Sequence, residues 1–336
     1  MLDIIVIPLL ICLILSFRIR KGPGETDIFS RTQTACINGL FVFMIFVRHF
    51  SEYIQAGRFD WVLGVGQRYL DQLIVVSFML FSGYSFYLQQ KKNSGYLRKL
   101  PKKILLLWLM FIVTVLAFLL MQLLRGNTYD LSTVLLSLIG VKKVGNSNWY
   151  VFAIMFFWLF SYISFSQKRI KPNILMAVFT AVYMLVFSQF LIKDPVMYNT
   201  VIAYLYGIIL AKHEPAILGF LRKKAVFWAA ATVSLAGIVT GLCFREHFIP
   251  FETAVTAFSL FLILFCMKIK MESPVFLWLN MYSFEIYLIQ RIPMIALEGK
   301  ISPNILYFLV SLLLTLGLAL VWKKIYELLA KRILAG

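Results

Sequence analysis

Residues 38–54, NGLFVFMIFVRHFSEYI, combine an apolar run with ionisable groups that stand before its end. With the two residues ahead of it, the run is long enough to cross a bilayer as a helix. Arg48, His49 and Glu52 would then lie inside or at the edge of the membrane, where charge is costly and usually faces a bundle interior or a watery cavity. The stretch therefore predicts a membrane helix that carries part of a polar site.

The whole chain has the composition of a protein that crosses the membrane many times. Its 336 residues are 61% hydrophobic and 16% aromatic, the mean hydropathy is +0.85, and apolar runs recur at the length of a membrane helix. Backbone groups in lipid must be satisfied by a helix or a closed barrel, and the sequence lacks the short alternating segments of a barrel. We therefore expect an all-α fold, a polytopic membrane helical bundle.

We expect about eleven transmembrane helices, with boundaries taken from the apolar runs. Their residues are 3–17, 36–54, 69–88, 104–123, 149–166, 173–192, 197–211, 225–244, 252–267, 276–297 and 304–322. Residues 1–30 would hold an extra N-terminal anchor and its inner loop, residues 31–322 the main membrane domain, and residues 323–336 a cytoplasmic tail. The loop 124–148 contains LSTVLLSLIG, which is too short to span and fits a re-entrant or interfacial piece over an external opening.

The distribution of lysine and arginine predicts the orientation. Loops after odd-numbered spans, together with the tail, hold 23 of the 33 Lys and Arg residues, loops after even-numbered spans hold 8, and Arg48 and Arg291 lie within spans. Because cytoplasmic loops carry the excess of cations, we expect the N-terminus outside the cell membrane and the tail in the cytoplasm. The net charge of +18 thus reflects topology and does not indicate nucleic-acid binding.

Asn38 and His49 are expected on one face of their helix, because eleven residues correspond to about 16 Å along the axis and about 20° around it. A polar face would then connect the cytoplasmic half of the membrane with the outer half. Two interpretations of His49 stay open, a buried neutral imidazole and a general base. Arg48 and Glu52 are equally well explained by side chains that reach for the outer interface.

Two neighbouring stretches place polar groups at the cytoplasmic side. FMLFSGYSFYLQQ, residues 78–90, contains Ser82, Gly83 and Ser85, whose small size would let helices approach closely, an explanation that suits Gly83 best. KKNSGYLRKLPKK, residues 91–103, brings six cations together. These cations follow the positive-inside rule or attract anionic lipid, and they also suit a phosphate-bearing cosubstrate.

The stretch 276–294, FLWLNMYSFEIYLIQRIPM, carries Glu285 near its middle and Gln290 and Arg291 further out. Such groups within a span are by default candidates for a functional site. Counted from the inner ends of their helices, Gln290 and His49 lie at one depth. The two side chains can therefore share a cavity if their helices are neighbours.

Other aromatic and histidine residues have ordinary explanations. Trp149 and Tyr150, in the stretch NSNWYVF that opens a span from outside, are typical of an aromatic belt at the membrane interface. His213 and His247 are expected in loops on opposite sides of the membrane, and neither lies at the depth of His49. The histidines are too scattered for a zinc site, and we expect no metal.

Five stretches, taken in order, resemble the motifs of the membrane acyltransferase type 3 family, the integral-membrane O-acyltransferases of bacterial surface glycans. They are NGLFVFMIFVRH (38–49), FMLFSGYSF (78–86), LRKLPKKILLLW (97–108), NWYVFAIMFF (148–157) and SFEIYLIQ (283–290). The resemblance extends over about residues 31–322. Two positions depart from the family pattern, because Asn38 replaces a basic residue and Gln290 replaces a histidine. Both keep hydrogen-bonding capacity and lose charge.

The resemblance implies a core of ten helices that starts in the cytoplasm, which corresponds to the second to eleventh spans. It also implies acyl-CoA, in particular acetyl-CoA, as cosubstrate without a permanently bound cofactor. The acceptor would be a hydroxyl group of a cell-surface glycan or of a lipid-linked sugar, reached by a protein in contact with membrane lipid. The implied activity is that of an O-acyltransferase, most simply an O-acetyltransferase.

The polar residues fall into three expected roles in such an enzyme. His49 is expected to act as general base on the acceptor hydroxyl, with Glu285 or Glu52 orienting its ring, and an acyl-histidine intermediate is the less favoured variant. The nucleotide end of coenzyme A is expected on Arg98, Lys99, Lys102 and Lys103. The substrates are expected to contact Asn38, Arg48, Ser82, Trp149, Tyr150 and Gln290.

Two other functions stay open on the sequence. A transporter or flippase for a sugar, a polysaccharide repeat or an acyl compound fits helices with intramembrane ions equally well by physics alone. An inactive family member that serves as a subunit of an envelope-assembly complex is the third interpretation, which the neutral side chains at 38 and 290 keep open. Formation of a covalent ester would separate an acyltransferase from both.

Overall fold

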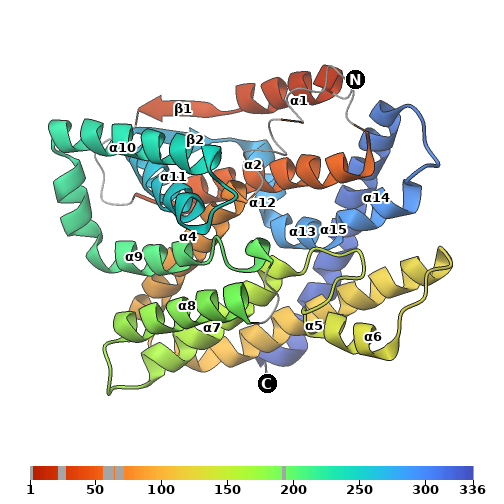
Figure 1. Ribbon diagram of the computed structural model, residues 1–336, viewed down its shortest axis with the longest axis horizontal. Coiled ribbons are helices and arrows are strands. Elements are labelled where there is room, and N and C mark those ends of the chain that lie inside the picture. Colours follow the sequence, from red (N-terminus) through yellow and green to blue (C-terminus); the bar gives the residue numbers. More distant parts are fainter. Residues whose placement is uncertain (1–2, 22–27, 56–63, 65–71, 191–193, 336) are drawn as a thin grey trace.

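The computed structural model describes residues 3–21, 28–55, 64, 72–190 and 194–335, and within them the chain forms an all-α helical bundle (Figure 1). Nine helices in these ranges are long and apolar enough to cross a membrane. They are α2 (Arg31–Phe50), α4 (Leu73–Lys92), α5 (Tyr96–Leu124), α7 (Trp149–Ser166), α8 (Pro172–Gln189), α9 (Ile202–Leu221), α10 (Lys224–Cys243), α11 (Phe248–Lys268) and α15 (Asn304–Ala335). The predicted fold class, a polytopic membrane bundle, is confirmed.

The extra N-terminal span predicted at 3–17 is a helix of 13 residues, α1 (Asp3–Leu15). At 1.5 Å per residue it is about 20 Å long, against a hydrocarbon core of about 30 Å. In Figure 1 it runs opposite to α2, and its N-terminus lies on the side at which α2 ends. The strand β1 (Arg18–Lys21) then pairs antiparallel with β2 (Ile269–Glu272), which ties the segment to the bundle. The segment is therefore shorter than the full span that the sequence predicts.

The tenth predicted span, 276–297, is divided into three short helices. These are α12 (Pro274–Met281), α13 (Ser283–Ile289) and α14 (Arg291–Leu297). The break between α13 and α14 falls where the ring of Pro293 would clash with the carbonyl group four residues before it in a continuous helix. Interrupted helices occur at membrane depth where the backbone is buried in protein or lines a cavity. This break positions Gln290 and Arg291 inside the bundle.

Two helices extend further than the apolar runs predict. α15 continues through residues 323–335, so the residues of the predicted cytoplasmic tail are helical and continuous with the last span. α9 is expected to end near residue 211 and continues to Leu221 through a kink at His213, just before Pro215. In both cases charged residues follow the apolar run without ending the helix.

Close helix crossings hold the middle of the bundle together. A Cβ atom on Gly83 of α4 would lie 2.0 Å from the carbonyl oxygen of Tyr204 on α9, and one on Gly207 of α9 would lie 2.1 Å from that of Leu80. Likewise, a Cβ on Gly39 of α2 would lie 2.0 Å from the carbonyl oxygen of Phe276 on α12. Small residues permit such backbone contact between membrane helices. The packing role expected for Gly83 is therefore present.

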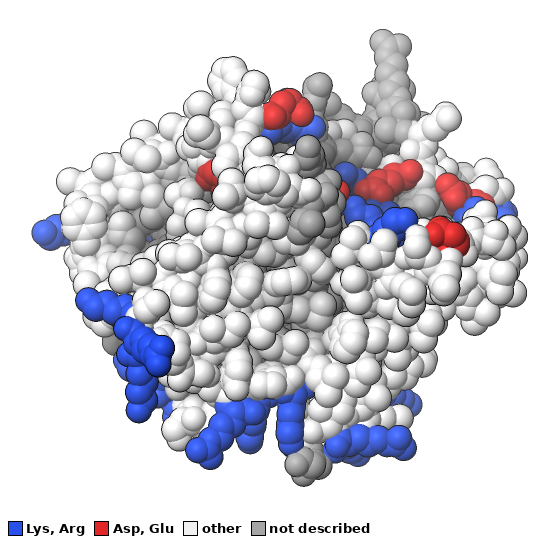
Figure 2. All heavy atoms as spheres, turned by 60° about the horizontal axis from the view of Figure 1, so that its bottom comes forward, with Lys and Arg blue, Asp and Glu red and all other residues white. Residues whose placement is uncertain are grey.

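Charged side chains divide the molecule into two ends (Figure 2). The basic end carries Lys and Arg where α4 meets α5, α7 meets α8 and α9 meets α10, and at the end of α15. The mixed-charge end carries both signs, including the ion pairs Arg125–Glu298 at 3.3 Å and Lys143–Asp194 at 3.5 Å. In Figure 2 a largely uncharged band separates the cations along the lower and left edges from the mixed charges at the top and upper right. This pattern fits a bundle that crosses a membrane.

Candidate active site

One face of α2 carries polar groups at both ends and apolar groups between them. Ser30 caps the helix by accepting a hydrogen bond from the backbone N–H of Gln33 at 3.3 Å. From that start, positions 38, 42, 45 and 49 follow at spacings of four, three and four residues, which places them in one stripe. The stripe consists of Asn38, Val42, Ile45 and His49. Asn38, Val42 and Ile45 line two cavities that follow each other along the helix, and His49 lies one turn beyond them.

The first cavity lies toward the basic end and has a volume of about 290 Å³. We call it the polar cavity because its walls carry hydroxyl and amide groups. Its polar walls are Thr34, Asn38, Ser82, Ser85, Gln89, Tyr96, Tyr150 and Ser283. Asn38, which lines this cavity, has a buried side-chain oxygen without a protein partner. Three residues predicted to contact substrate, Asn38, Ser82 and Tyr150, are thus brought together here.

The second cavity continues toward His49 and has a volume of about 100 Å³. We call it the apolar cavity. Its walls are Val42, Ile45, Val75, Phe78, Tyr150, Ser283, Phe284 and Tyr287. Phe78, Tyr150 and Ser283 line both cavities, so the two adjoin. A hydrogen bond between the hydroxyl groups of Tyr150 and Ser82 joins α7 to α4 at this junction.

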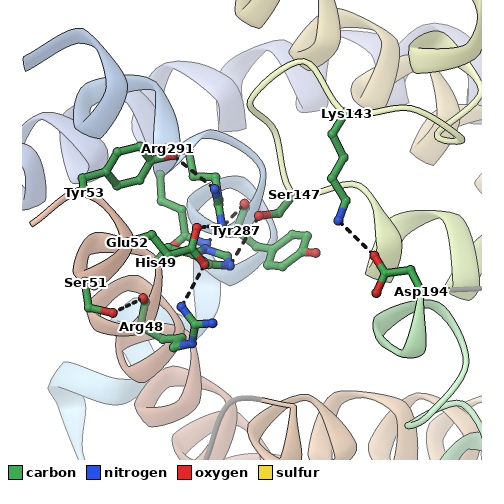
Figure 3. Close-up of polar contacts among 11 residues, drawn as sticks. Arg48, His49, Ser51, Glu52, Tyr53, Lys143, Ser147, Asp194, Tyr287 and Arg291 are labelled. Carbon is green, nitrogen blue, oxygen red and sulfur yellow. Dashed lines mark hydrogen bonds and ion pairs between the residues drawn. The ribbon is translucent and has the colours of Figure 1, made fainter. Parts of the chain in front are cut away.

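His49 lies in the last turn of α2, one turn beyond Ile45 (Figure 3). Its Nε2 atom is 3.4 Å from the Oγ atom of Ser147, which belongs to the loop between α6 (Leu131–Leu138) and α7. Its Nδ1 atom is buried and has no protein partner. Because a neutral imidazole has one donor and one acceptor nitrogen, the ring can donate to Ser147 and keep Nδ1 as an acceptor.

Ion pairs fix the end of α2 against the start of α14. Nη1 of Arg48 is 2.8 Å from one carboxylate oxygen of Glu52, and Arg291 binds the other oxygen. Arg291 also donates to the hydroxyl group of Tyr53 at 3.1 Å. Figure 3 shows these side chains grouped around His49. Arg48 and Glu52 therefore belong to a network that brackets the imidazole, in addition to lying near the membrane edge.

The loop that carries Ser147 is held by its own polar groups and by glycines. Nδ2 of Asn148 donates to the carbonyl oxygens of Gly140 and Lys142, at 2.5 and 3.2 Å. Gly140 and Gly145 have φ angles of +85° and +104°, which side chains other than that of glycine rarely adopt. The sequence stretch 139–148 therefore has a defined path that ends beside His49. Ser147 was not predicted, and its only sequence signal is its place directly before the stretch NWYVF.

Buried polar atoms without protein partners gather on the segments that meet at His49. Donors of this kind are Nδ2 of Asn146 and Nε of Arg291, and acceptors are Nδ1 of His49, Oδ1 of Asn148 and Oε1 of Gln290. Buried polar groups in proteins are normally hydrogen-bonded, so such a concentration needs an explanation. Donors and acceptors of this kind suit a polar substrate next to the imidazole.

The predicted orienting carboxylate of His49 is not Glu285. Glu285 is 2% exposed and lies 3.4 Å from Nζ of Lys323 on α15. It lies on the side of α13 that packs on α15, whereas α13 meets the apolar cavity with Phe284 and Tyr287. Glu52 binds the two arginines. The group in contact with the ring is the hydroxyl of Ser147, so the carboxylate contact that the sequence predicts is not formed.

The remaining predicted substrate residues are buried near the site. Gln290 is fully buried at the break between α13 and α14, and its Nε2 donates to the carbonyl oxygen of Tyr287 at 3.4 Å. The next residue, Arg291, pairs with Glu52 just beyond α2, so Gln290 lies near the end of that helix, but it lines neither cavity. Trp149 is 8% exposed, and its ring is 6.1 Å from that of Tyr150, which lines both cavities. Trp149 thus supports the wall rather than forming it.

The four predicted coenzyme-binding cations lie in the first two turns of α5, at the basic end. Nζ of Lys103 stands 4.3 Å from the ring centre of Tyr96, a wall of the polar cavity. Lys102 is half-buried like Lys103, and Arg98 and Lys99 are exposed. In the described part of the chain none of the four forms an ion pair with a carboxylate. They are therefore available to an anionic ligand beside the polar cavity.

Comparison with known proteins gives one match. A family model described as an acyltransferase domain matches residues 36–322, which is most of the chain. Searches of curated proteins and of solved structures give no match. The matched range contains α2 from Cys36 onward, both cavities apart from Thr34, the loop with Ser147, and the helices α13 and α14.

Proposed function

The chain belongs to the acyltransferase type 3 family and is a membrane acyltransferase, and on that premise we propose that it transfers an acyl group from a coenzyme A thioester to a hydroxyl group of a glycan or lipid-linked sugar. Acetyl-CoA is the expected donor. The observation that carries this proposal is the pair of adjoining cavities along one face of α2, which extend from the basic end to Ile45, one helical turn before His49.

The basic end supports binding of the donor. Coenzyme A carries phosphate groups, which arginine and lysine bind by charge-assisted hydrogen bonds. Arg98, Lys99, Lys102 and Lys103 would hold these phosphates beside Tyr96. The slender pantetheine arm, with its amide groups, would then lie in the polar cavity against Asn38 and the serines of α4. Asn38 and His49 are about 16 Å apart along the helix axis. The pantetheine arm would have to be extended to span this distance.

His49 is the proposed general base. The acceptor hydroxyl oxygen attacks the thioester carbonyl carbon, and His49 takes the hydroxyl proton on Nδ1. The tetrahedral intermediate collapses as the carbon–sulfur bond breaks, and the imidazolium returns the proton to the leaving thiolate, so that an ester and free coenzyme A result. A positioned base of this kind typically contributes about 10² to 10⁴ in rate.

The donors around the imidazole support a place for the developing negative charge. Nδ2 of Asn146 and Nε of Arg291 are buried without protein partners. Such preorganised donors stabilise the oxyanion of a tetrahedral intermediate. We propose that these two groups donate hydrogen bonds to the carbonyl oxygen of the thioester. Ser147 is a positioning residue in this scheme, because it holds the ring through Nε2.

The positive-inside rule supports an orientation for the reaction. The basic end would face the cytoplasm, where acyl-CoA is found, and the mixed-charge end with His49 would face the outside of the cell membrane. The acyl group then crosses most of the membrane within the protein. The acceptor hydroxyl reaches His49 from the outer side.

The small size of the apolar cavity argues against a transporter or flippase of sugars. The apolar cavity is about 100 Å³, which is smaller than a cavity of about 150 Å³ that binds one benzene molecule. A sugar ring with its hydroxyl groups is larger than benzene and would bury them against apolar walls. The passage suits a narrow acyl-bearing arm.

The proposal is tested by formation of an ester. Purified protein in liposomes is supplied with acetyl-CoA labelled in the acetyl group and with glycans extracted from the envelope of the source cells. Label in an alkali-labile ester on the glycan, released in step with free coenzyme A, supports the acyltransferase. If no labelled glycan forms and unmodified sugar crosses the liposome membrane, the result favours the transporter.

A further inference from the structure

We propose that the apolar cavity binds the acyl chain of the donor and restricts it to about four carbon atoms without charge. This inference rests on the proposed function, because it takes the thioester to lie between the polar cavity and His49. It goes further in assigning donor selection to particular side chains. These are Val42 and Ile45 of α2 and Val75 of α4.

The position of the cavity relative to His49 supports this assignment. Ile45 precedes His49 by one turn and Val42 by two turns on the same face of α2, which is about 6 and about 10 Å along the axis. A thioester whose carbonyl carbon lies beside the imidazole would therefore have its acyl chain next to Ile45 and Val42, together with the end of the pantetheine arm. Val75 and Phe78 of α4 close the other side.

The volume of the cavity sets the length of the chain. About 100 Å³ is available, whereas a cavity of about 150 Å³ holds the six carbon atoms of benzene. By proportion, at most about four carbon atoms of the acyl chain fit. The walls cannot easily move apart, because Val42, Ile45 and Val75 are only 1%, 6% and 5% exposed and belong to the packed core.

The chemistry of the walls excludes a charged acyl group. Among the described residues no charged side chain lines this cavity, and its only hydroxyl groups are those of Ser283, Tyr150 and Tyr287. A carboxylate placed there would lose its hydration without gaining a counter-ion. Butyryl and succinyl groups have the same number of carbon atoms, so they separate the effect of charge from the effect of length.

The test compares kcat/KM for acetyl-CoA, butyryl-CoA, octanoyl-CoA and succinyl-CoA with one glycan acceptor in liposomes. The native protein should use acetyl-CoA and butyryl-CoA, and it should use octanoyl-CoA and succinyl-CoA at least about tenfold less well, as is usual for groups that do not fit an apolar pocket. Val42→Ala and Val75→Ala should each raise the ratio of octanoyl to acetyl transfer by about tenfold. Val47→Ala, the same change on α2 outside both cavities, should leave the ratio unchanged.

Ratios within one protein sample do not depend on how much of the sample is folded, so a destabilised variant still gives a result. Val75→Ile, which fills the cavity further, should lower butyryl transfer relative to acetyl transfer. Native protein that uses octanoyl-CoA as well as acetyl-CoA, or ratios that none of the cavity variants changes, would overturn the inference and leave the acyltransferase intact. No transfer from any of the four donors would overturn the proposed function itself, and the inference with it.

Discussion

Ser147 Oγ lies 3.4 Å from Nε2 of His49, although the two residues are 98 positions apart in the chain. The contact joins the end of α2 to the loop before α7, and it orients an imidazole whose other nitrogen is free to accept a proton. It also places the ring where the apolar cavity ends and the network of Arg48, Glu52 and Arg291 begins. The following predictions depend on this arrangement.

Replacing His49 by alanine should lower kcat by about 10² to 10⁴, because the base for the acceptor hydroxyl is lost. Membrane insertion and yield should remain normal, since the only hydrogen bond of the ring within the described residues is the one with Ser147. Ester formation from labelled acetyl-CoA is the measurement. His247→Ala is the matched control, because His247 lies outside the site, at the start of α11. If His49→Ala turns over at nearly the rate of the control, His49 is not the general base.

Replacing Ser147 by alanine should lower kcat about three- to tenfold and leave KM for acyl-CoA unchanged. The loss corresponds to one hydrogen bond worth about 1 kcal/mol that orients the ring but does not touch the donor. Ser147→Thr keeps the hydroxyl and should restore most of the rate. A parallel fall of activity in both variants, or a rise in KM alone, would show that the loop acts on substrate binding and not on the imidazole.

Much of the fold is predictable because the membrane imposes it. Apolar runs of sufficient length have to form helices in lipid, and the cation-rich loops separate them. The breaks around α13 are harder to place, since the run from 276 to 297 is apolar enough to span. Pro293 is a signal for one break, but a proline inside a membrane helix often causes only a kink. For α1 the sequence predicts too long a helix. Its hydropathy is that of a membrane span, but the helix has only 13 residues.

The site is predictable in part for a related reason. Ionisable groups at membrane depth stand out, which leads to His49, and the 3.6-residue period places Asn38 on the same face. Ser147 gives no such signal, because serine before a helix is ordinary and its contact depends on how the loop folds back. The partner of Glu285 depends on the rotation of the seven-residue α13. That rotation is set by tertiary packing against α15, and no local sequence pattern indicates it.

Glu285 should be a structural residue. Glu285→Gln removes the carboxylate partner of Lys323, which keeps its hydrogen bond to the carbonyl oxygen of Met281. The expected cost is about 1 kcal/mol, at the low end of the usual range because Lys323 is one third exposed. Thermal unfolding in detergent should therefore occur at a lower temperature, while kcat per folded molecule changes less than about threefold. Adding Lys323→Met should recover part of the lost stability. A fall in kcat of the size expected for His49→Ala would assign Glu285 to the reaction.

Gly83→Ala should impair folding more than activity. The added Cβ would meet the carbonyl oxygen of Tyr204 at 2.0 Å, so α4 and α9 would have to separate, at a cost of about 1 to 3 kcal/mol or more. The fraction of monodisperse protein after extraction is the measurement. Gly219→Ala, in α9 where a Cβ meets no atom within 4 Å, should be neutral or slightly stabilising. Equal behaviour of the two variants would mean that the helices do not cross as closely as described.

Binding of the donor should depend on the cations that begin α5 and not on positive charge at the basic end in general. Lys102→Gln combined with Lys103→Gln should raise KM for acetyl-CoA about tenfold or more, because charge-assisted bonds to phosphate are lost, and should leave KM for the glycan acceptor unchanged. The effect of added salt on KM should weaken in the same variant, since screening acts on the charges that have been removed. Lys168→Gln combined with Arg169→Gln removes two cations from the connection between α7 and α8 at the same end of the bundle, and KM should then stay within about twofold of the native value. If both pairs of substitutions raise KM equally, the cations serve as a diffuse field or as topology signals, and the polar cavity beside Tyr96 would have to receive coenzyme A without them.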